Sequence, residues 1–238
     1  PQAITSLITL RLQPPTPVIM KAIVCQNYGP PSTLVFKEVD LPEPGPKEVR
    51  IRLKACGVNF PDTLIIQGRY QFKPALPFTP GSDIAGVIDA VGEGVRGHKV
   101  GDEVFGFVQT GGFAEQVIAP ARNVFPKPPG MEDAVAASFL MAYGTSYHAL
   151  KDRAVLKEGE TLVVLGASGG VGLAAVELGK LMGARVIACA STSEKLELCR
   201  EYGADETLNY TTEDLKARIK ELTGKDGADI IYDPVGGD

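Results

Sequence analysis

A glycine-rich turn in the second half of the chain has the residue types and the spacing that bind phosphate. The segment 166–172 reads GASGGVG, and Ala167, Gly169 and Gly172 match the spacing G-x-G-x-x-G with alanine in the first place. It lies between a predicted strand and a predicted helix, the context in which this pattern binds a dinucleotide. Gly169 would let the backbone approach a pyrophosphate, and Gly172 would let the helix pack closely on the sheet.

Unpaired amides at the start of that helix would face the anion. The sequence therefore predicts a dinucleotide site here; the alternative is a glycine-rich turn without a ligand. The candidate cofactor-binding residues of the turn are Ala167, Ser168, Gly169, Gly170, Val171 and Gly172.

The end of the next predicted strand decides between the two nicotinamide dinucleotides. Enzymes that use NAD normally carry Asp or Glu there, which accepts hydrogen bonds from the ribose hydroxyls. This chain has Ala190 at that place, followed by Ser191, Thr192 and, a little further on, Lys195. Hydroxyl groups and an ammonium group hold a 2′-phosphate, whereas an acid repels it. The sequence favours NADP(H); the alternative is that Ser191 only caps a helix and Lys195 is a solvated charge.

Strands and helices alternate regularly around these residues, after about residue 132. A first helix is expected over 134–150. The strands expected after it are 161–165, 185–190, 207–209 and 228–232, and the helices are 171–182, 194–202 and 213–222. Capping boxes are expected at two helix starts, Ser191 with Glu194 and Thr211 with Asp214. Strand–helix alternation with short apolar strands indicates a parallel sheet built from right-handed crossovers.

The part of the chain before this alternation has a different sequence pattern, with short runs of strand-forming residues interrupted by Gly and Pro. A strand is expected over 20–24, and residues 49–54 alternate strictly between apolar and charged, as a half-buried strand does. Strands at close spacing with turns between them indicate a compact, mostly antiparallel β domain. Residues 1–19 have one charge and a proline cluster, and we expect a disordered or artefactual extension, with a transit-peptide remnant as the alternative.

Composition excludes several classes of protein. The 238 residues are 44% hydrophobic and 22% charged, which is ordinary for a soluble globular protein. A net charge of −5 without a long basic run makes nucleic acid an unexpected partner. Two histidines and four widely spaced cysteines provide neither a multi-histidine metal centre nor a disulfide framework, and suit a reducing compartment. No apolar stretch is long enough to span a bilayer. We expect a cytoplasmic protein, or alternatively one of the mitochondrial matrix.

Three segments, 59–70, 76–83 and 167–172, resemble the medium-chain dehydrogenase/reductase superfamily. Within it the chain is similar to the zinc-independent, zeta-crystallin-like quinone oxidoreductases, from Met20 to Asp238. The resemblance implies an α/β protein in which a GroES-like β domain (20–140) is followed by a Rossmann doubly wound parallel sheet (141–238), with the active site between them. The sequence stops after the fourth parallel strand, so the Rossmann domain is expected to be incomplete and the full-length protein to be a homodimer.

The resemblance also bears on zinc. Zinc-dependent relatives have a cysteine at the place of Asn59, a His-Glu pair at the places of Ser82 and Asp83, and a four-cysteine loop after the Gly-Asp turn at 101–102. This chain has Asn and Ser at two of those places and no cysteine over 107–112. Asn and Ser are poor zinc ligands beside thiolate and imidazole, so no metal is expected.

The reaction implied is NADPH-dependent reduction of a quinone or an α,β-unsaturated carbonyl compound by direct hydride transfer. Such acceptors need mainly orientation and hydrogen-bond donors near the forming enolate or phenolate. Two alternatives stay open: a non-enzymatic, crystallin-like NADPH-binding protein, and an inactive fragment of the reductase.

Motif matching to the family assigns candidate residues on both sides of the cleft. Asn59 would form a hydrogen bond near the nicotinamide or substrate, Tyr70 would offer a phenol, and Asp62 is the third catalytic candidate. The alternatives are that Asn59 caps a turn, Tyr70 belongs to the core and Asp62 serves a helix start. Many relatives have tyrosine in place of Leu64, and its loss favours a more apolar acceptor. The cofactor contacts implied outside the turn are Phe60, Leu64, Thr145, Ser191, Thr192, Lys195, Tyr210 and Val235.

Overall fold

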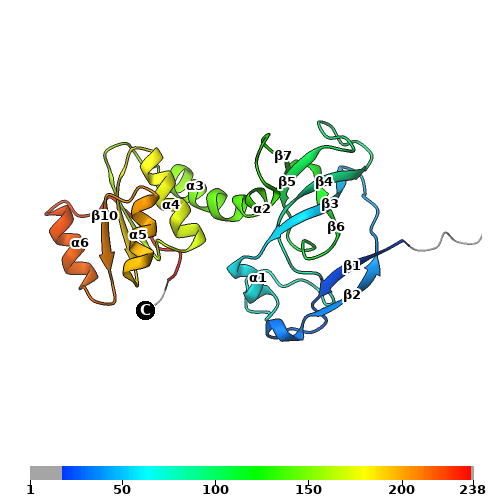
Figure 1. The fold of residues 1–238 in the computed structure, drawn as a ribbon, viewed down its shortest axis with the longest axis horizontal. Coiled ribbons are helices and arrows are strands. Elements are labelled where there is room, and N and C mark those ends of the chain that lie inside the picture. The colour runs from blue at the N-terminus through cyan, green and yellow to red at the C-terminus, as the bar shows by residue number, and fades with distance from the viewer. Residues whose placement is uncertain (1–17, 237–238) are drawn as a thin grey trace, which may run out of the picture.

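The computed structural model describes residues 18–236. Of the extension expected over 1–19, residues 1–17 lie outside the described residues, and Ile19 already belongs to the first strand. Figure 1 shows two lobes joined by a helical segment. We call them the β lobe, which contains β1 to β7, and the α/β lobe, which contains β8 to β11. The order of the lobes and their classes agree with the expected α/β fold.

Antiparallel pairing organises the β lobe. Its main sheet has the strand order β6-β3-β4-β5-β7, and β1 and β2 form a separate pair. The side chains of Val49 and Ile51 are fully buried, as the alternating pattern of this strand predicts. The elements of this lobe are β1 (Ile19–Val24), β2 (Val35–Asp40), β3 (Glu48–Gly57), α1 (Phe60–Ile65), β4 (Asp83–Val91), β5 (Glu103–Phe107), β6 (Gln116–Pro120) and β7 (Val124–Pro126).

The α/β lobe contains a parallel sheet in the order β10-β9-β8-β11. Its elements are β8 (Thr161–Leu165), α4 (Gly170–Leu181), β9 (Arg185–Ala190), α5 (Ser193–Glu201), β10 (Glu206–Asn209), α6 (Leu215–Thr223) and β11 (Ile230–Tyr232). The strand order reverses between β8 and β11, which lie side by side although three helices separate them in sequence. In doubly wound sheets, ligands bind at the carboxyl ends of the strands at this reversal.

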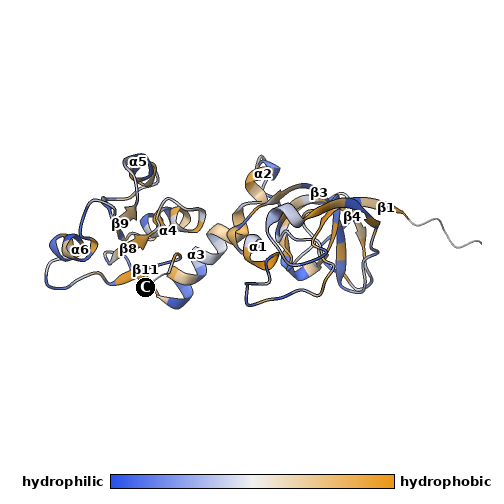
Figure 2. Cartoon of the chain, turned by 90° about the horizontal axis from the view of Figure 1, so that it is seen from below, coloured by the Kyte–Doolittle hydropathy of each residue, from blue (hydrophilic) through white to orange (hydrophobic). Residues whose placement is uncertain are grey.

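Alternating residues of the parallel strands divide the core of this lobe between two faces. Leu162 and Val164 pack in one buried cluster with residues of α4 and α5, whereas Val163 packs in another with residues of α6. Apolar side chains on both faces explain why these strands are continuous apolar runs instead of an alternating pattern. Figure 2 shows α5 and α6 as mainly hydrophilic helices beside strands of hydrophobic colour, as expected for helices whose outer faces meet water.

The segment that connects the lobes is not the single α-helix expected over 134–150. It consists of a short α-helix, a π-helical stretch, a further α-helical turn and a second π-helical stretch. These are α2 (Asp133–Ala136), Leu140–Gly144, α3 (Thr145–Tyr147) and His148–Arg153. The helical prediction holds for most of the segment, but a hydrophobic pattern does not distinguish π winding from α winding. Wide π turns arise from local packing and occur frequently at functional sites.

Both expected capping boxes are wrong, because each helix is capped by a residue other than the predicted one. α5 is capped by Thr192, whose Oγ1 accepts the amide of Lys195 at 3.4 Å, instead of by Ser191. Ser191 and Thr192 both have a hydroxyl group and an acidic residue nearby. Thr192 is the cap because it is the residue with extended backbone directly before the helix.

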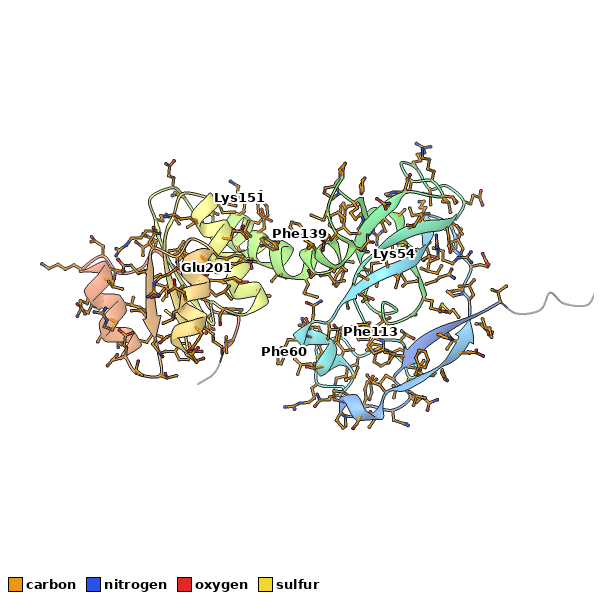
Figure 3. All side chains as sticks on the ribbon, viewed as in Figure 1. Lys54, Phe60, Phe113, Phe139, Lys151 and Glu201 are labelled. Carbon is orange, nitrogen blue, oxygen red and sulfur yellow. The ribbon has the colours of Figure 1, made fainter. Side chains whose placement is uncertain are left out.

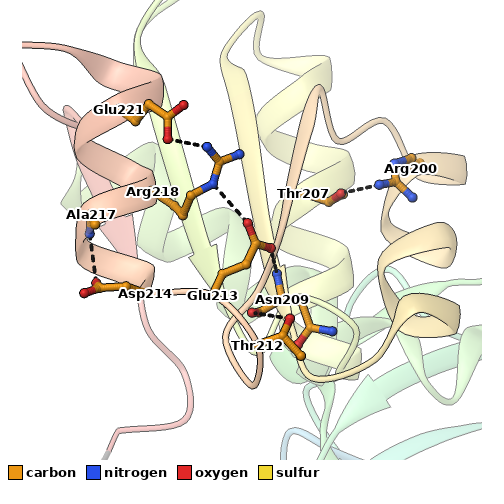
Figure 4. A network of polar contacts seen from close by, with 9 residues as sticks. All are labelled: Arg200, Thr207, Asn209, Thr212, Glu213, Asp214, Ala217, Arg218 and Glu221. Carbon is orange, nitrogen blue, oxygen red and sulfur yellow. Dashed lines mark hydrogen bonds and ion pairs between the residues drawn. The ribbon is translucent and has the colours of Figure 1, made fainter.

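α6 is capped by Asp214, whose Oδ1 accepts the amide of Ala217 at 2.9 Å, instead of by Thr211. Figure 4 shows this cap and the neighbouring ion pairs of Arg218 with Glu213 and Glu221. Glu213 also accepts the amide of Asn209 at 2.8 Å and thereby ties α6 to the end of β10.

Candidate functional site

The glycine-rich turn after β8 is shaped by close backbone contacts. A Cβ at position 172 would lie 2.3 Å from the carbonyl oxygen of Gly166, so only glycine allows α4 to start this close to the strand. Gly166 itself has a φ of +60°, and a Cβ there would lie 2.4 Å from Cγ2 of Val235. The amide of Ala167, which is fully buried, donates to the carbonyl of Cys189 at 3.0 Å. These contacts fix the turn against β8 and β9.

The outer side of the same turn is open. Gly169 and Gly170 are exposed, and a Cβ at position 170 would meet nothing within 4 Å. The first amides of an α-helix have no partner within the helix, and their partial positive charge attracts anions. The turn also lies at the reversal of strand order. An open, amide-lined turn at this place has the form that a pyrophosphate requires.

Two polar side chains lie together at the end of β9. Nζ of Lys195 donates to Oγ of Ser191 at 3.1 Å, and both Thr192 and Lys195 are exposed. Thr211, in the turn after β10, donates through Oγ1 to the carbonyl of Ser191 at 3.2 Å. The cluster therefore presents hydroxyl groups and one ammonium group near the end of β9 and the glycine-rich turn.

A pocket of about 320 Å³ lies beside the turn, on the side of β11. It brings together Gly166 with two residues expected to bind cofactor, Tyr210 and Val235. Both side chains are well exposed, at 43% and 71%. Residues from the ends of β8, β10 and β11 thus line one hollow at the same edge of the sheet.

In the β lobe, Asn59 and Asp62 form one unit at the start of α1. Oδ2 of Asp62 accepts the backbone amide of Asn59 at 2.8 Å, and Asp62 is only 4% exposed. Burial raises the pKa of Asp62, and hydrogen bonds from the backbone of Asn59 and Gly81 oppose this rise. The side-chain nitrogen of Asn59 is buried and, within the part of the chain that the structure describes, forms no hydrogen bond. Asn59 is thus the N-cap of α1 and forms a capping box with Asp62, while the side-chain nitrogen of Asn59 remains without a partner among the described residues.

The other β-lobe candidates are placed differently. Phe60 is 74% exposed and, in Figure 3, stands on α1 where this helix faces the α/β lobe. Leu64 is half-buried on the same helix. Tyr70 packs against a cluster of Cys25, Ile65, Ile66 and Phe78. This packing favours the core alternative for Tyr70.

Thr145 lies in the connecting segment between the lobes. It is exposed and lines a pocket of about 410 Å³ with aromatic and aliphatic residues of both the β lobe and the segment. Its neighbour Ser146 is fully buried and donates through Oγ to the carbonyl of Val171 at 2.7 Å. Ser146 was not predicted as a site residue. No sequence pattern marks it, because its partner is 25 residues away.

Asp83 is a second residue that the sequence analysis did not single out for a role of its own. Its carboxylate is completely buried, and Oδ2 accepts the amide of Met141 at 3.0 Å. Burial raises the pKa of Asp83 to about 6; the amides of Met141 and Leu140 oppose this rise, and the charge of Asp62 adds to it. Oδ1 has no hydrogen-bond partner among the described residues. The only sequence signal was the Gly-Ser-Asp motif that contains it.

The positions that bind zinc in zinc-dependent relatives offer few donors. Ser82, which is 3% exposed, donates through Oγ to the carbonyl of Gln109 at 3.2 Å. Burial, together with the charges of Asp62 and Asp83, raises the pKa of the nearby Cys56 thiol to about 12. Across residues 18–236, no group of three or more His, Cys, Asp or Glu side chains is arranged to hold a metal ion. In the same residues, no helix is long and apolar enough to cross a membrane.

Two family models match the chain. The "Alcohol dehydrogenase GroES-like domain" matches residues 45–129, which lie in the β lobe. The "Zinc-binding dehydrogenase" model matches residues 170–238, which begin at α4. The matches fall on either side of the connecting segment and agree with the two lobes.

Several known proteins are similar to this chain over most of its length. The "Quinone oxidoreductase-like protein 2 homolog" of Nematostella vectensis is 40% identical over 220 residues, 92% of this chain and 60% of the relative. The structure of the Pseudomonas syringae quinone oxidoreductase has a TM-score of 0.88 and 34% identity, and the match covers 92% of this chain and 67% of that one. Mycobacterial Rv1454c complexed with NADPH has a TM-score of 0.85 and 36% identity, covering 92% and 68%.

The two lobes, the glycine-rich turn and the strand order agree with these similarities. The chain belongs to the quinone oxidoreductase family of the medium-chain dehydrogenases/reductases. It spans less than two thirds of the length of the first curated relatives it matches.

Proposed function

We propose that the protein reduces quinones or α,β-unsaturated carbonyl compounds with NADPH, by direct hydride transfer and without zinc. In this proposal, residues 20–140 form the catalytic domain and residues 141–238 the cofactor domain. The observation that carries it is the open, amide-lined turn at 166–172, beside the exposed pair of Lys195 and Ser191.

The α/β lobe would hold the cofactor through three groups of atoms. The free amides at the start of α4 would hold the pyrophosphate. Lys195, Ser191 and Thr192 would hold the 2′-phosphate, which a carboxylate at the same place would repel. Tyr210 and Val235 would lie against the adenosine end and the turn, respectively. When bound, NADPH supplies the hydride. NADPH in complex with mycobacterial Rv1454c supports this choice of cofactor.

The β lobe would orient the acceptor. The unpaired side-chain amide of Asn59 is a hydrogen-bond donor that can stabilise the oxygen on which negative charge develops. The exposed ring of Phe60 offers an apolar wall next to it. Because Leu64 is aliphatic, this wall suits an apolar, planar acceptor better than a polar one.

The zinc-free mechanism is supported by the donor set. Asn59 offers an amide and Ser82 a hydroxyl that is already bonded to a carbonyl, and neither competes with thiolate or imidazole for zinc. Conjugated acceptors need less polarisation than simple ketones, because the acceptor itself delocalises the charge that the hydride brings.

The experiment is the oxidation of NADPH by ortho-quinones and by conjugated enones, with and without a strong chelator. It is carried out on this chain and on a version extended at its C-terminus. We expect saturable, quinone-dependent oxidation that the chelator leaves unchanged. Saturable NADPH binding without turnover in both versions would instead indicate a non-enzymatic binding protein. Bound zinc and loss of activity on chelation would indicate a zinc-dependent dehydrogenase.

A further inference from the structure

The connecting segment is attached to both lobes by hydrogen bonds from buried side chains. Figure 1 shows it running between the lobes as a bridge. Met141, in the middle of the segment, is bonded to Asp83 of β4, and Ser146, five residues later, is bonded to the first turn of α4. Only three residues separate Met141 at the first attachment from Thr145, which we propose to lie beside the nicotinamide. A shift of either attachment would therefore move Thr145 as well.

The attachment to the β lobe lies at the end of strand β3 that leads to Asn59. Asp83 is paired with Gly57 in the sheet, two residues before Asn59. A Cβ at Gly57 would lie 2.4 Å from the carbonyl oxygen of Ala137, so the segment approaches β3 as closely as the backbone allows. The carboxylate of Asp83 then bonds the amide of Met141 at the beginning of the π-helical stretch. Negative charge at this end of a helix is favourable.

The attachment to the α/β lobe lies at the phosphate-binding turn. Ser146 Oγ bonds the carbonyl of Val171, in the first turn of α4, and lies 3.4 Å from the hydroxyl of Tyr232 at the end of β11. One helical turn earlier, the hydroxyl of Tyr143 donates to Glu177 of α4. The segment is thus held against the helix whose N-terminus would bind the pyrophosphate.

A buried carboxylate is a costly group with which to bond backbone amides. Taking a carboxylate out of water costs free energy unless its oxygens are paired, and Oδ1 of Asp83 is unpaired among the described residues. The rise of its pKa expresses the same cost. A neutral side chain at this place would cost less, and costly groups of this kind are concentrated at sites where geometry matters.

We propose that Asp83 is a positioning residue: its bond to Met141 fixes the distance between the dinucleotide turn and Asn59. The role in hydride transfer rests on the proposed function. Asp83 itself touches neither cofactor nor substrate in this proposal, and it acts through the connecting segment. Hydride transfer depends steeply on the placement of donor and acceptor, and a misplacement of 1 Å can cost about 100-fold in rate.

The kinetic test compares Asp83→Ala, Asp83→Asn and a control, Asp205→Asn. Asp205 also bonds a backbone amide, that of Val186 at 2.8 Å, but within the α/β lobe. We expect Asp83→Ala to lower kcat at least tenfold while the dissociation constant of NADPH changes less than twofold. Asp83→Asn retains an oxygen for Met141 and should recover most of kcat, and Asp205→Asn should keep kcat within twofold. Unchanged kcat in Asp83→Ala, or equal losses of kcat in Asp205→Asn, would overturn the proposal.

A structural test separates this proposal from the proposed function. Spin labels at two exposed sites, Lys54 in the β lobe and Glu201 in the α/β lobe, report the distance between the lobes (Figure 3). We expect Asp83→Ala to shift or broaden the distance distribution, and Asp205→Asn to leave it unchanged. An unchanged distribution in Asp83→Ala refutes the positioning role even if kcat falls. If the parent protein does not oxidise NADPH with any acceptor, the proposed function fails, and the distances still decide whether Asp83 fixes the lobes.

Discussion

The glycine-rich turn at 166–172 and the junction around Asp83 differ in the chemistry of the groups that form them. The turn consists of backbone alone, with glycines where a Cβ would collide with the preceding strand and open space where a ligand would lie. The junction depends on a buried charge, on side chains with unpaired atoms and on partners far away in sequence. In the proposed function the turn receives a charge from a ligand, whereas the junction already contains a charge of its own.

This difference has a consequence for stability. The turn should tolerate loss of its ligand, because its amides are exposed to water when no anion is bound. The junction bears the cost of its buried carboxylate in the folded protein whether or not a ligand is bound. Substitutions at the crowded glycines of the turn should therefore harm both folding and binding. At the junction, removal of the charge should favour folding, whereas loss of the hydrogen bond to Met141 should harm activity.

The largest effect is expected for Gly172→Ala. Its Cβ would lie 2.3 Å from a backbone oxygen and 2.9 Å from Cα of Ala167, so the start of α4 must move. We expect the free energy of unfolding to fall by about 3 kcal/mol, and NADPH binding to be lost. Gly170→Ala is the matched control, because its Cβ meets open space and its free energy of unfolding should not fall. Denaturant unfolding measures both, and equal values would show that α4 does not pack as described.

Asp83→Asn tests the junction through its pH dependence. A carboxyl whose pKa is raised by folding contributes stability below its unfolded pKa, and this contribution is lost as the pH rises through the folded pKa of about 6. The variant should therefore gain stability relative to the parent between about pH 4 and pH 6, and should be roughly 2 kcal/mol more stable at pH 7. The charge of Asp62 adds to the rise of the Asp83 pKa, and the charge of Asp83 in turn raises the pKa of the neighbouring Cys56 thiol. A difference in unfolding free energy that does not vary with pH would contradict this assignment.

Lys195→Ala tests the part of the cofactor site that does not consist of backbone. Loss of a charged hydrogen bond to the 2′-phosphate should weaken NADPH about 10- to 100-fold. Binding of NADH should change less than twofold, because NADH lacks that phosphate. Lys151→Ala, an exposed lysine of the connecting segment, is the control for net charge. Equal losses for both dinucleotides on titration would remove Lys195 from the 2′-phosphate site.

The smallest effect concerns the helix after β10. Asp214→Ala removes the observed cap of α6 and should cost about 1 kcal/mol. Thr211→Ala removes the cap expected from sequence and should cost less, because Thr211 bonds the loop and not the helix. Amide hydrogen exchange in α6 should rise only in Asp214→Ala. The opposite ranking would restore the sequence-based assignment.

Sequence predicted the parts of the fold that local rules determine. The bounds 161–165 and 185–190 agree with β8 and β9, and the turn between β8 and α4 was identified from glycine spacing alone. The caps of α5 and α6 were misplaced because neighbouring residues satisfied the same pattern.

Contacts between segments that are distant in sequence could not be predicted from the sequence. Asp83 is 58 residues from Met141, and Ser146 is 25 from Val171, so no periodicity or motif connects them. The packing of Tyr70 against a core cluster was equally hard to predict, because a tyrosine side chain suits a core and a cleft equally well.

The most direct test of the central claim is calorimetric titration of the protein with NADPH and with NADH. The account predicts one saturable site, with NADPH bound tighter than NADH, and loss of that heat in Gly172→Ala. Absence of heat with both dinucleotides would contradict the assignment of the turn at 166–172 as a cofactor site.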